Sequence, residues 1–227
     1  ILYKIHDYRE AEDFISALTS ELPLPKESKV IDLACGKGRH SVFLNKLGYE
    51  VLGLDLSAQS IAHNKQFEND TLHFRVHDMR QAIGGEKADA VFNLFTSFGY
   101  FDDEADDKKV FRSVSDILKP GGIFILDYLN QKMVRNSLVG DTVVEREGIE
   151  FKINKKIEDN FVIKNIEFSD EGHNFSYFER VKLHTPETIA GYAAEAGFEV
   201  IKLWGNYDLS DFDEELSPRC INYFRKI

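Results

Sequence analysis

Along the first half of the chain, short apolar runs alternate with segments in which apolar residues recur at helical spacing. The runs at residues 30–34, 50–54, 72–76, 88–92 and 123–126 predict strands. Between them, apolar residues recur at helical spacing and predict helices within residues 41–47, 58–67 and 104–118. In the helix over 58–67, Ser57 is the expected N-cap, and Ile61, Ala62 and Phe67 are expected to face inward. Strands that alternate with helices are typical of an α/β fold with a parallel sheet.

Residues 1–28 predict a helix that precedes the first strand as a lid or entry element. Phe14, Ile15 and Leu18 form its apolar stripe, and the prolines at 23 and 25 end it.

Beyond residue 130 the pattern becomes that of an antiparallel sheet. Between residues 143 and 183, short segments alternate apolar and polar residues, with turn residues at 148, 159–160 and 170–172. This predicts a meander of three or four strands. The last helix is expected to begin at Thr185-Pro186, because threonine caps helices well and proline suits the first turn. Strands over 199–204 and 219–225 are expected to end the chain.

The segment 29–57 has the clearest chemistry. Its first strand carries a single acid, Asp32, and runs into a turn that contains Gly36 and Gly38; its second strand ends at Asp55. Glycine has no Cβ, so the backbone can turn sharply and approach a ligand closely at the start of the helix. A carboxylate about 20 residues further on is well placed to bind the two hydroxyls of a ribose. The segment therefore predicts a nucleoside site.

The type of nucleoside depends on a third glycine. Dinucleotide-binding folds have one three residues after the second glycine, but here Gly38 is followed by Arg39, His40 and Ser41. This pattern disfavours a dinucleotide without removing it as an alternative.

The segment resembles the first two motifs of the class I S-adenosylmethionine-dependent methyltransferases, which match here as VIDLACGKG and VLGLDLS. Three further matches follow in the family's order: Asp78-Met79 after the third strand, the junction after the fourth strand, and Lys-Pro-Gly-Gly before the fifth. The resemblance covers residues 29–128 well and 185–227 loosely.

The resemblance implies a Rossmann-like, seven-stranded sheet in the order 3-2-1-4-5-7-6, with the last strand antiparallel. It divides the chain into an N-terminal helix or lid (1–28), a cofactor-binding core (29–130), an antiparallel β insertion that covers the site (131–184), and a helix with a hairpin that completes the core sheet (185–227). In this family such an insertion tends to supply substrate contacts.

The resemblance also implies S-adenosylmethionine as the cofactor, with S-adenosylhomocysteine as its product, and no metal. Asp78 would accept from the adenine amine while Met79 packs on the ring, and Tyr3 or Tyr8 could touch the methionine end. The cofactor-binding residues that it predicts are Asp32, Ala34, Cys35, Gly36, Gly38, Asp55, Leu56, Asp78, Met79, Asn93 and Phe95.

Methyl transfer is an in-line displacement at a methyl group on a sulfonium, so the enzyme must align the reactants and exclude water. An amine or hydroxyl acceptor also needs a group that takes its proton. Tyr100, His173 and His184 are the candidates, although for His173 and His184 a solvated position on a strand is favoured. No Asn-Pro-Pro-Tyr motif follows the fourth strand, which disfavours nucleic-acid bases and protein glutamines as acceptors.

The composition of the chain limits the classes of partner that the protein is expected to bind. The 227 residues suffice for one α/β domain with a modest insertion, and the net charge of -11 argues against nucleic acid as a partner. Acids within residues 102–107 and 208–215 could attract a cationic amine. Two cysteines indicate a reducing cytoplasm, and neither a membrane-spanning run nor a signal peptide is recognisable. The oligomeric state is left open between monomer and homodimer.

The sequence thus predicts a methyltransferase that acts on a nitrogen or oxygen of a small molecule. Two alternatives stay open at this point: an NAD-dependent oxidoreductase, which Asp55 would suit, and a protein that binds S-adenosylmethionine without catalysis.

Overall fold

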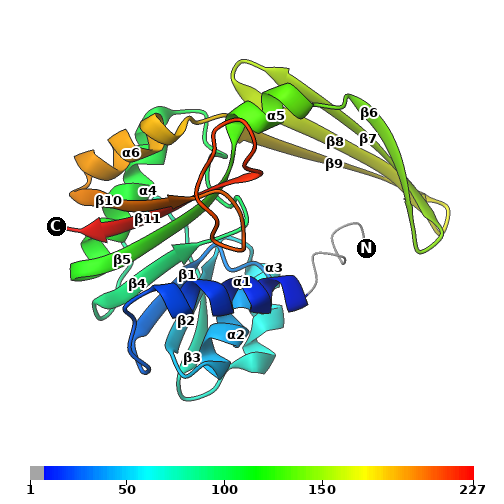
Figure 1. Ribbon diagram of the computed structural model, residues 1–227. Helices are drawn as coiled ribbons and strands as arrows, with labels where there is room; N and C mark the ends of the chain where they lie inside the picture. The colour runs from blue at the N-terminus through cyan, green and yellow to red at the C-terminus, as the bar shows by residue number, and fades with distance from the viewer. Residues whose placement is uncertain (1–7) are drawn as a thin grey trace.

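The computed structural model describes residues 8–227 and contains two sheets (Figure 1). The larger has seven strands in the order β10-β11-β5-β4-β1-β2-β3, and all pairs are parallel except those of β11 with β5 and β10. The order predicted from the sequence is therefore confirmed. The core strands are β1 (Lys29–Leu33), β2 (Glu50–Asp55), β3 (Leu72–Val76), β4 (Ala88–Asn93), β5 (Leu118–Leu129), β10 (Phe198–Trp204) and β11 (Arg219–Lys226).

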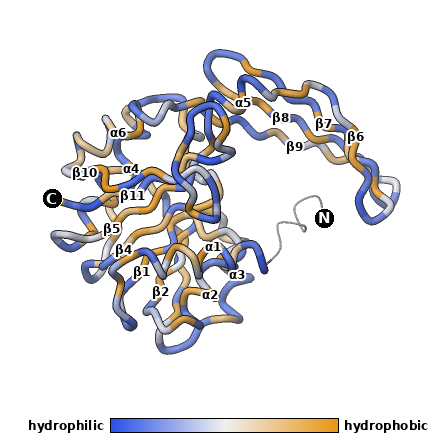
Figure 2. Tube along the Cα trace, viewed as in Figure 1, coloured by the Kyte–Doolittle hydropathy of each residue, from blue (hydrophilic) through white to orange (hydrophobic). Residues whose placement is uncertain are grey.

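Helices cover both faces of this sheet. Two apolar clusters form the core: one joins the sheet to α4 (Glu104–Ile117) and α6 (Pro186–Glu195), the other joins it to α1 (Tyr8–Glu21), α2 (Arg39–Lys46) and α3 (Ala58–Asn64). A short 3₁₀ turn, η1 (Lys65–Phe67), follows α3. Figure 2 shows the core strands as mainly hydrophobic, as expected for a sheet that is buried on both faces.

The predicted helix caps are present. The side chain of Ser57 accepts from the Ser60 amide, and that of Thr185 accepts from the Thr188 amide, each at 3.2 Å. Phe14, Ile15 and Leu18 are buried, so the stripe of the first helix packs on the core. Tyr8 opens α1, whereas the other candidate for the methionine end, Tyr3, lies outside the described residues.

Three details differ from the sequence predictions. Ala62 is exposed, and the buried residues of α3 are Ile61 and Asn64. Strand β5 begins at Leu118, before the Lys-Pro-Gly-Gly turn, because the pairing with β4 continues across an irregularity between Ala88 and Ala90. A further helix, α5 (Gln131–Ser137), follows β5, and the side chain of Asn130 caps it.

The second sheet is the predicted antiparallel meander, and it has four strands. These are β6 (Asp141–Arg146), β7 (Ile149–Glu158), β8 (Phe161–Asp170) and β9 (His173–Lys182), paired in chain order. The sheet projects from the core beside α5 (Figure 1). Its register places Phe151, Phe168 and Phe175 opposite one another, so they share one face.

Candidate active site

The glycine turn between β1 and α2 has a backbone that favours glycine. Gly36 and Gly38 have φ angles of 54° and 77°, in the left-handed region where side chains are costly. A Cβ on Gly38 would lie 3.1 Å from the ring of Phe74 and 3.2 Å from Asn64. The second glycine is therefore fixed both by its conformation and by its neighbours.

Asp55 ends β2 and holds this turn in place. Its Oδ2 accepts from the Gly36 amide and its Oδ1 accepts from the Ser57 amide, both at 2.8 Å. Each carboxylate oxygen has two lone pairs, so both oxygens can accept another hydrogen bond. The neighbouring side chain, Leu56, is 70% exposed, which leaves an apolar surface beside the carboxylate.

Asp32 and Cys35 lie beneath the turn. Asp32 is buried in β1 and accepts from the Ser41 hydroxyl of α2 at 2.5 Å. Burial raises the pKa of its carboxyl to about 6, in spite of this hydrogen bond. Burial also raises the pKa of the Cys35 thiol, which argues against a nucleophilic role. Ala34, between them, adopts a positive φ of 64° and completes the bend.

Asn64 of α3 also supports the turn, a role that was not predicted from the sequence. Its side chain is fully buried, and its amide donates to the Gly36 carbonyl at 2.8 Å. An asparagine on the inward face of a predicted amphipathic helix was the available signal, because buried amides are normally hydrogen-bonded.

Asp78 follows β3, and Arg80 holds its side chain. The Arg80 guanidinium donates to Asp78 Oδ2 at 2.6 Å, and these hydrogen bonds lower the pKa of the Asp78 carboxyl. Arg80 also donates to Asp106 at the start of α4, at 2.9 Å. The half-buried Met79 is anchored through its carbonyl, which accepts from Ser113 at 2.7 Å. Met79 is thus fixed by a contact with α4, and Asp78 is linked to α4 through Arg80.

The loop after β4 is held by a buried ion pair. Asp127 of β5 accepts from the Phe95 amide at 2.7 Å and from the Arg219 Nε of β11 at 2.8 Å. Phe95 has a positive φ of 62°, and the guanidinium of Arg39 lies 4.4 Å from the centre of its ring.

Asn93, at the end of β4, is buried and donates to the Leu33 carbonyl at 2.8 Å. Together these contacts fix β4 and its loop beside β1.

A cavity of about 430 Å³ lies between this loop and the smaller sheet, and we call it the inner cavity. Thr96 and Arg219 line it from the core, and β7, β8, β9 and α5 contribute the other side. Its lining residues are Thr96, Leu129, Val134, Ser137, Leu138, Val139, Lys155, Val162, Lys164, Glu179, Val181 and Arg219.

The three candidate proton acceptors lie in different places. Tyr100 is about half exposed in the loop after β4, and His173 is exposed at the start of β9.

His184 is buried, and its Nε2 lies 3.2 Å from the Asp107 carboxylate. It lines a different cavity, of about 460 Å³, which Gln131, Arg135 and Asn160 also line. The structure does not gather these three side chains around one point.

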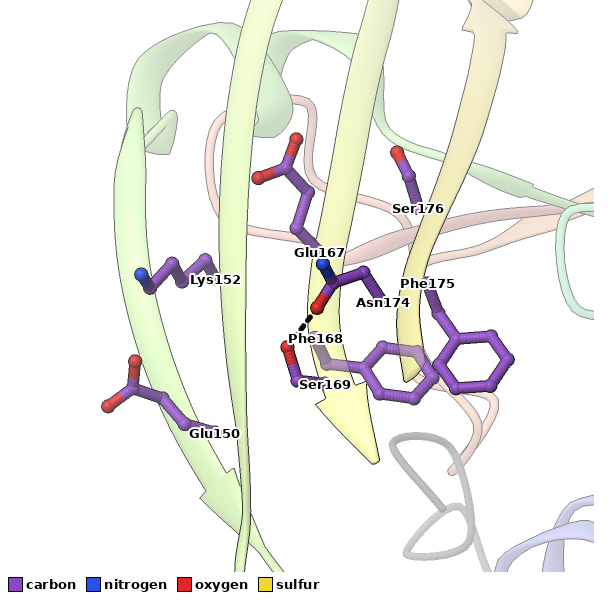
Figure 3. A pocket seen from close by; sticks show the side chains of 8 residues that line it. All are labelled: Glu150, Lys152, Glu167, Phe168, Ser169, Asn174, Phe175 and Ser176. Atoms are coloured by element: carbon purple, nitrogen blue, oxygen red, sulfur yellow. Dashed lines mark hydrogen bonds between the residues drawn. The ribbon is translucent and has the colours of Figure 1, made fainter. Parts of the chain in front are cut away.

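A shallow groove of about 550 Å³ on the smaller sheet contains none of the predicted site residues (Figure 3). Charged side chains from β7 and β8 point to one side, while Phe168 and Phe175 point to the other (Figure 3). Ser169 and Asn174 are joined there by a hydrogen bond of 2.6 Å. The groove is lined by strands β7, β8 and β9 alone, so it is separate from the glycine turn.

A sequence model of the family described as "Methyltransferase domain" matches residues 24–179, well over half of the chain. The chain belongs to this methyltransferase family. The match begins just before β1 and includes the glycine turn, Asp55, Asp78 and the loop after β4.

Two relatives illustrate the similarity of this methyltransferase to known proteins. Putative methyltransferase YqeM of Bacillus subtilis (strain 168) is 37% identical over 110 residues, which are 47% of this chain and 44% of that protein. A dTDP-3-amino-3,4,6-trideoxy-alpha-D-glucopyranose N,N-dimethyltransferase of Streptomyces venezuelae is 29% identical over 206 residues, 86% of this chain and 85% of that protein. The chain thus spans less than half of the first relative and most of the second.

Solved structures show the same fold over nearly all of this chain. An S-adenosylmethionine-dependent methyltransferase from Clostridium acetobutylicum ATCC 824 has a TM-score of 0.85 at 22% identity, covering 99% of this chain and 95% of that one. DesVI of Streptomyces venezuelae has a TM-score of 0.75 at 23% identity, covering 100% and 94%. The predicted class I fold is therefore confirmed.

The prediction of an S-adenosylmethionine-dependent methyltransferase is confirmed, and the family assignment supports neither the oxidoreductase nor the non-catalytic alternative. Among residues 8–227, no helix is long and apolar enough to cross a membrane. In the same residues, His, Cys, Asp and Glu form no group of three that could hold a metal ion.

Proposed function

We propose that this methyltransferase transfers a methyl group to a nitrogen or oxygen of a small molecule held in the inner cavity. The observation that carries the proposal is the position of this cavity. Thr96 lines it and directly follows Phe95, in the loop that we expect beside the cofactor. One loop thus joins the predicted cofactor site to the cavity.

The residues present fit S-adenosylmethionine. Asp55 has lone pairs for a ribose diol, Leu56 offers an apolar surface beside it, and Gly36 leaves the backbone accessible, because a Cβ there would meet no atom within 4 Å. Asp78 and Met79 are the proposed adenine contacts, and Asn93 and Phe95 are expected beside the rest of the cofactor. Ala34, Gly38, Asp32 and Cys35 shape the turn around it.

Bound S-adenosylmethionine supplies a methyl group on a positively charged sulfur. What the chain supplies is alignment of the acceptor and exclusion of water. We propose residues 131–184 as the insertion that does both, since β7, β8, β9 and α5 line the inner cavity opposite the core. Tyr100, His173 and His184 stay predictions as proton acceptors, and an alanine substitution that leaves turnover unchanged would exclude the residue concerned.

Two relatives are N,N-dimethyltransferases of dTDP-amino sugars, and both matches cover more than 80% of this chain. They favour an amine as the acceptor. The net charge of -11 favours a small molecule over nucleic acid as the partner. Both cysteines are free and buried, which supports a cytoplasmic location for the enzyme.

The test is calorimetric titration with S-adenosylhomocysteine, with NADH alongside. We expect binding of S-adenosylhomocysteine alone, and Asp55→Ala should weaken it by about a hundredfold, because two hydrogen bonds to a carboxylate are lost. Asp70→Ala, an exposed acid that precedes β3, is the matched control and should bind normally. Transfer of labelled methyl to a panel of amines and alcohols then tests the reaction. Tight binding of NADH, or unchanged binding by Asp55→Ala, would refute the proposed site.

A further inference from the structure

Three charged residues stand side by side in the inner cavity. Lys155 on β7, Lys164 on β8 and Glu179 on β9 are directly opposite one another in the register of the smaller sheet. All three are half-buried and line the cavity, and the Lys164 ammonium lies 3.8 Å from the Glu179 carboxylate. The sheet therefore presents two cations and one anion to the space beside Thr96.

Among residues 8–227, the side chains that line the cavity carry more positive than negative charge. Its fourth charged residue, Arg219, is neutralised by the buried Asp127 at 2.6 Å. Within the described part of the chain, Lys155 and Lys164 then face one lining acid, Glu179, in a protein whose net charge is -11. A local excess of positive charge in an acidic protein points to an anionic ligand.

The two lysines also destabilise each other. Like charges directly opposite in a sheet are unfavourable. Burial is the main cause that lowers the pKa of Lys164; the charge of Lys155 adds to it, and Glu179 opposes it. An anion placed between the two ammonium groups would offset their repulsion and the unfavourable burial of the Lys164 charge.

The acids that the sequence suggested for attracting an amine lie elsewhere. No residue of 102–107 or 208–215 lines the inner cavity. Several are engaged in ion pairs: Asp106 with Arg80 at 2.9 Å, Asp107 with Lys182 at 2.6 Å, and Glu215 with Lys132 at 2.5 Å. Attraction of a cation by these segments is thus not supported by their positions.

We propose that the acceptor carries an anionic group, a carboxylate or a phosphate, that Lys155 and Lys164 bind inside the inner cavity. This rests on the proposed function, since it places the acceptor in the same cavity. The apolar side chains of Leu129, Val162 and Val181 line the rest of the space and suit an uncharged body. The acceptor class is therefore a small molecule with an anionic group at one end and the nucleophile toward Thr96.

The test is an NMR titration with inorganic phosphate, acetate and acetamide, with and without saturating S-adenosylhomocysteine. Phosphate or acetate should shift the amide resonances of β7 and β8 next to the cavity, and the comparison of the two identifies the anionic group. Acetamide, a neutral isostere of acetate, should not. Lys155→Gln and Lys164→Gln should each raise the dissociation constant of the anion about tenfold, because each removes a charge-assisted hydrogen bond.

Lys152→Gln is the matched control. Lys152 lies on β7 three residues from Lys155, on the opposite face, and it lines the groove of Figure 3. Its loss should therefore leave anion binding unchanged. Equal effects of acetamide and acetate, an equal loss in Lys152→Gln, or no binding of either anion would overturn the inference. Failure of the proposed function is distinct, since it would appear as absent binding of S-adenosylhomocysteine.

Discussion

The buried carboxyl of Asp32 shows how a single residue of the glycine segment affects the stability of the whole protein. It is 1% exposed, and its Oδ2 accepts from Ser41 at the start of α2. Desolvation is the largest cause of its high pKa, and the nearby charge of Asp55 adds to it. The residue ties β1 to α2, but its ionised form is unfavourable in this position.

Asp32→Asn should therefore stabilise the protein more at neutral pH than at acid pH. Because the folded-state pKa of about 6 lies above the ordinary 3.8, the stability that Asp32 contributes is fully present below about pH 3.8 and is lost as the pH rises through about 6. A difference of about two in pKa corresponds to about 3 kcal/mol. Urea unfolding between about pH 4 and pH 7 should show the variant gaining up to about 3 kcal/mol over the wild type.

Asp70→Asn serves as the control, because Asp70 is exposed. Its stability should follow that of the wild type at every pH. If the free energies of unfolding of Asp32→Asn and the wild type changed with pH in parallel, burial of the Asp32 carboxylate would not be destabilising the protein.

The shape of the glycine turn could be predicted because its residues are close in sequence, whereas the cofactor-binding roles of these residues stay predictions. Gly36, Gly38 and Asp55 belong to one β-turn-α-β unit, so their spacing indicated the turn and its carboxylate. Arg219 was missed, because it lies 92 residues from its partner Asp127. Arg80 is only two residues from Asp78, but its second contact, with Asp106, depends on the packing of α4.

At the scale of elements, Asn130 joins three parts of the fold. Its side-chain oxygen caps α5 by accepting from the Lys132 amide at 3.1 Å. Its amide group donates to the Glu214 and Ser217 carbonyls, at 2.8 and 2.9 Å, in the loop before β11. Asn130 therefore connects the end of the core sheet, the helix that begins the insertion, and the C-terminal loop.

Asn130→Ala should lower the free energy of unfolding by about 2 to 4 kcal/mol, because it removes a cap and leaves buried carbonyls without a donor. Asn130→Asp keeps the cap but loses the two donated hydrogen bonds. Its decrease in the free energy of unfolding should therefore come mainly from those two hydrogen bonds. Urea denaturation measures both. Asn154→Ala, at an exposed position of β7, is the control. A decrease in Asn130→Ala as small as that of the control would contradict the role given to Asn130.

The sequence predicted the elements of the core better than those of the insertion. The sheet order followed from the motif resemblance, and helix caps such as Thr185 are local signals. Helix α5 has seven residues and none of them is buried, so its pattern had no apolar stripe to recognise. The early start of β5 was not predicted, because the Pro-Gly-Gly run indicates a turn. In the structure the strand pairs with β4 on both sides of this run.

At the scale of the whole molecule, Lys182 joins the smaller sheet to the core. It ends β9, and its backbone amide donates to the Gly99 carbonyl at 2.7 Å while its own carbonyl accepts from the Tyr128 hydroxyl. Its ammonium donates to the fully buried Asp107 of α4 at 2.6 Å. Gly99 has to be glycine, because a Cβ there would lie 2.1 Å from the Tyr128 hydroxyl oxygen.

Asp107→Ala should therefore loosen the smaller sheet. It leaves the Lys182 ammonium buried without its carboxylate, a change that typically costs about 3 to 5 kcal/mol. Amide hydrogen exchange should become faster along β9, and the free energy of unfolding should fall by that amount. In the double variant Asp107→Ala with Lys182→Met, no buried charge is left, so most of the loss should be regained.

Asp102→Ala is the comparison, since Asp102 pairs with Arg180 at the surface and its side chain is 83% exposed. That pair should contribute less than about 1 kcal/mol, because solvent screens it. If Asp107→Ala loses no more than Asp102→Ala, the buried pair is not what holds the two sheets together. The backbone contacts of Lys182 with Gly99 and Tyr128 would then be the connection that positions the inner cavity over the core.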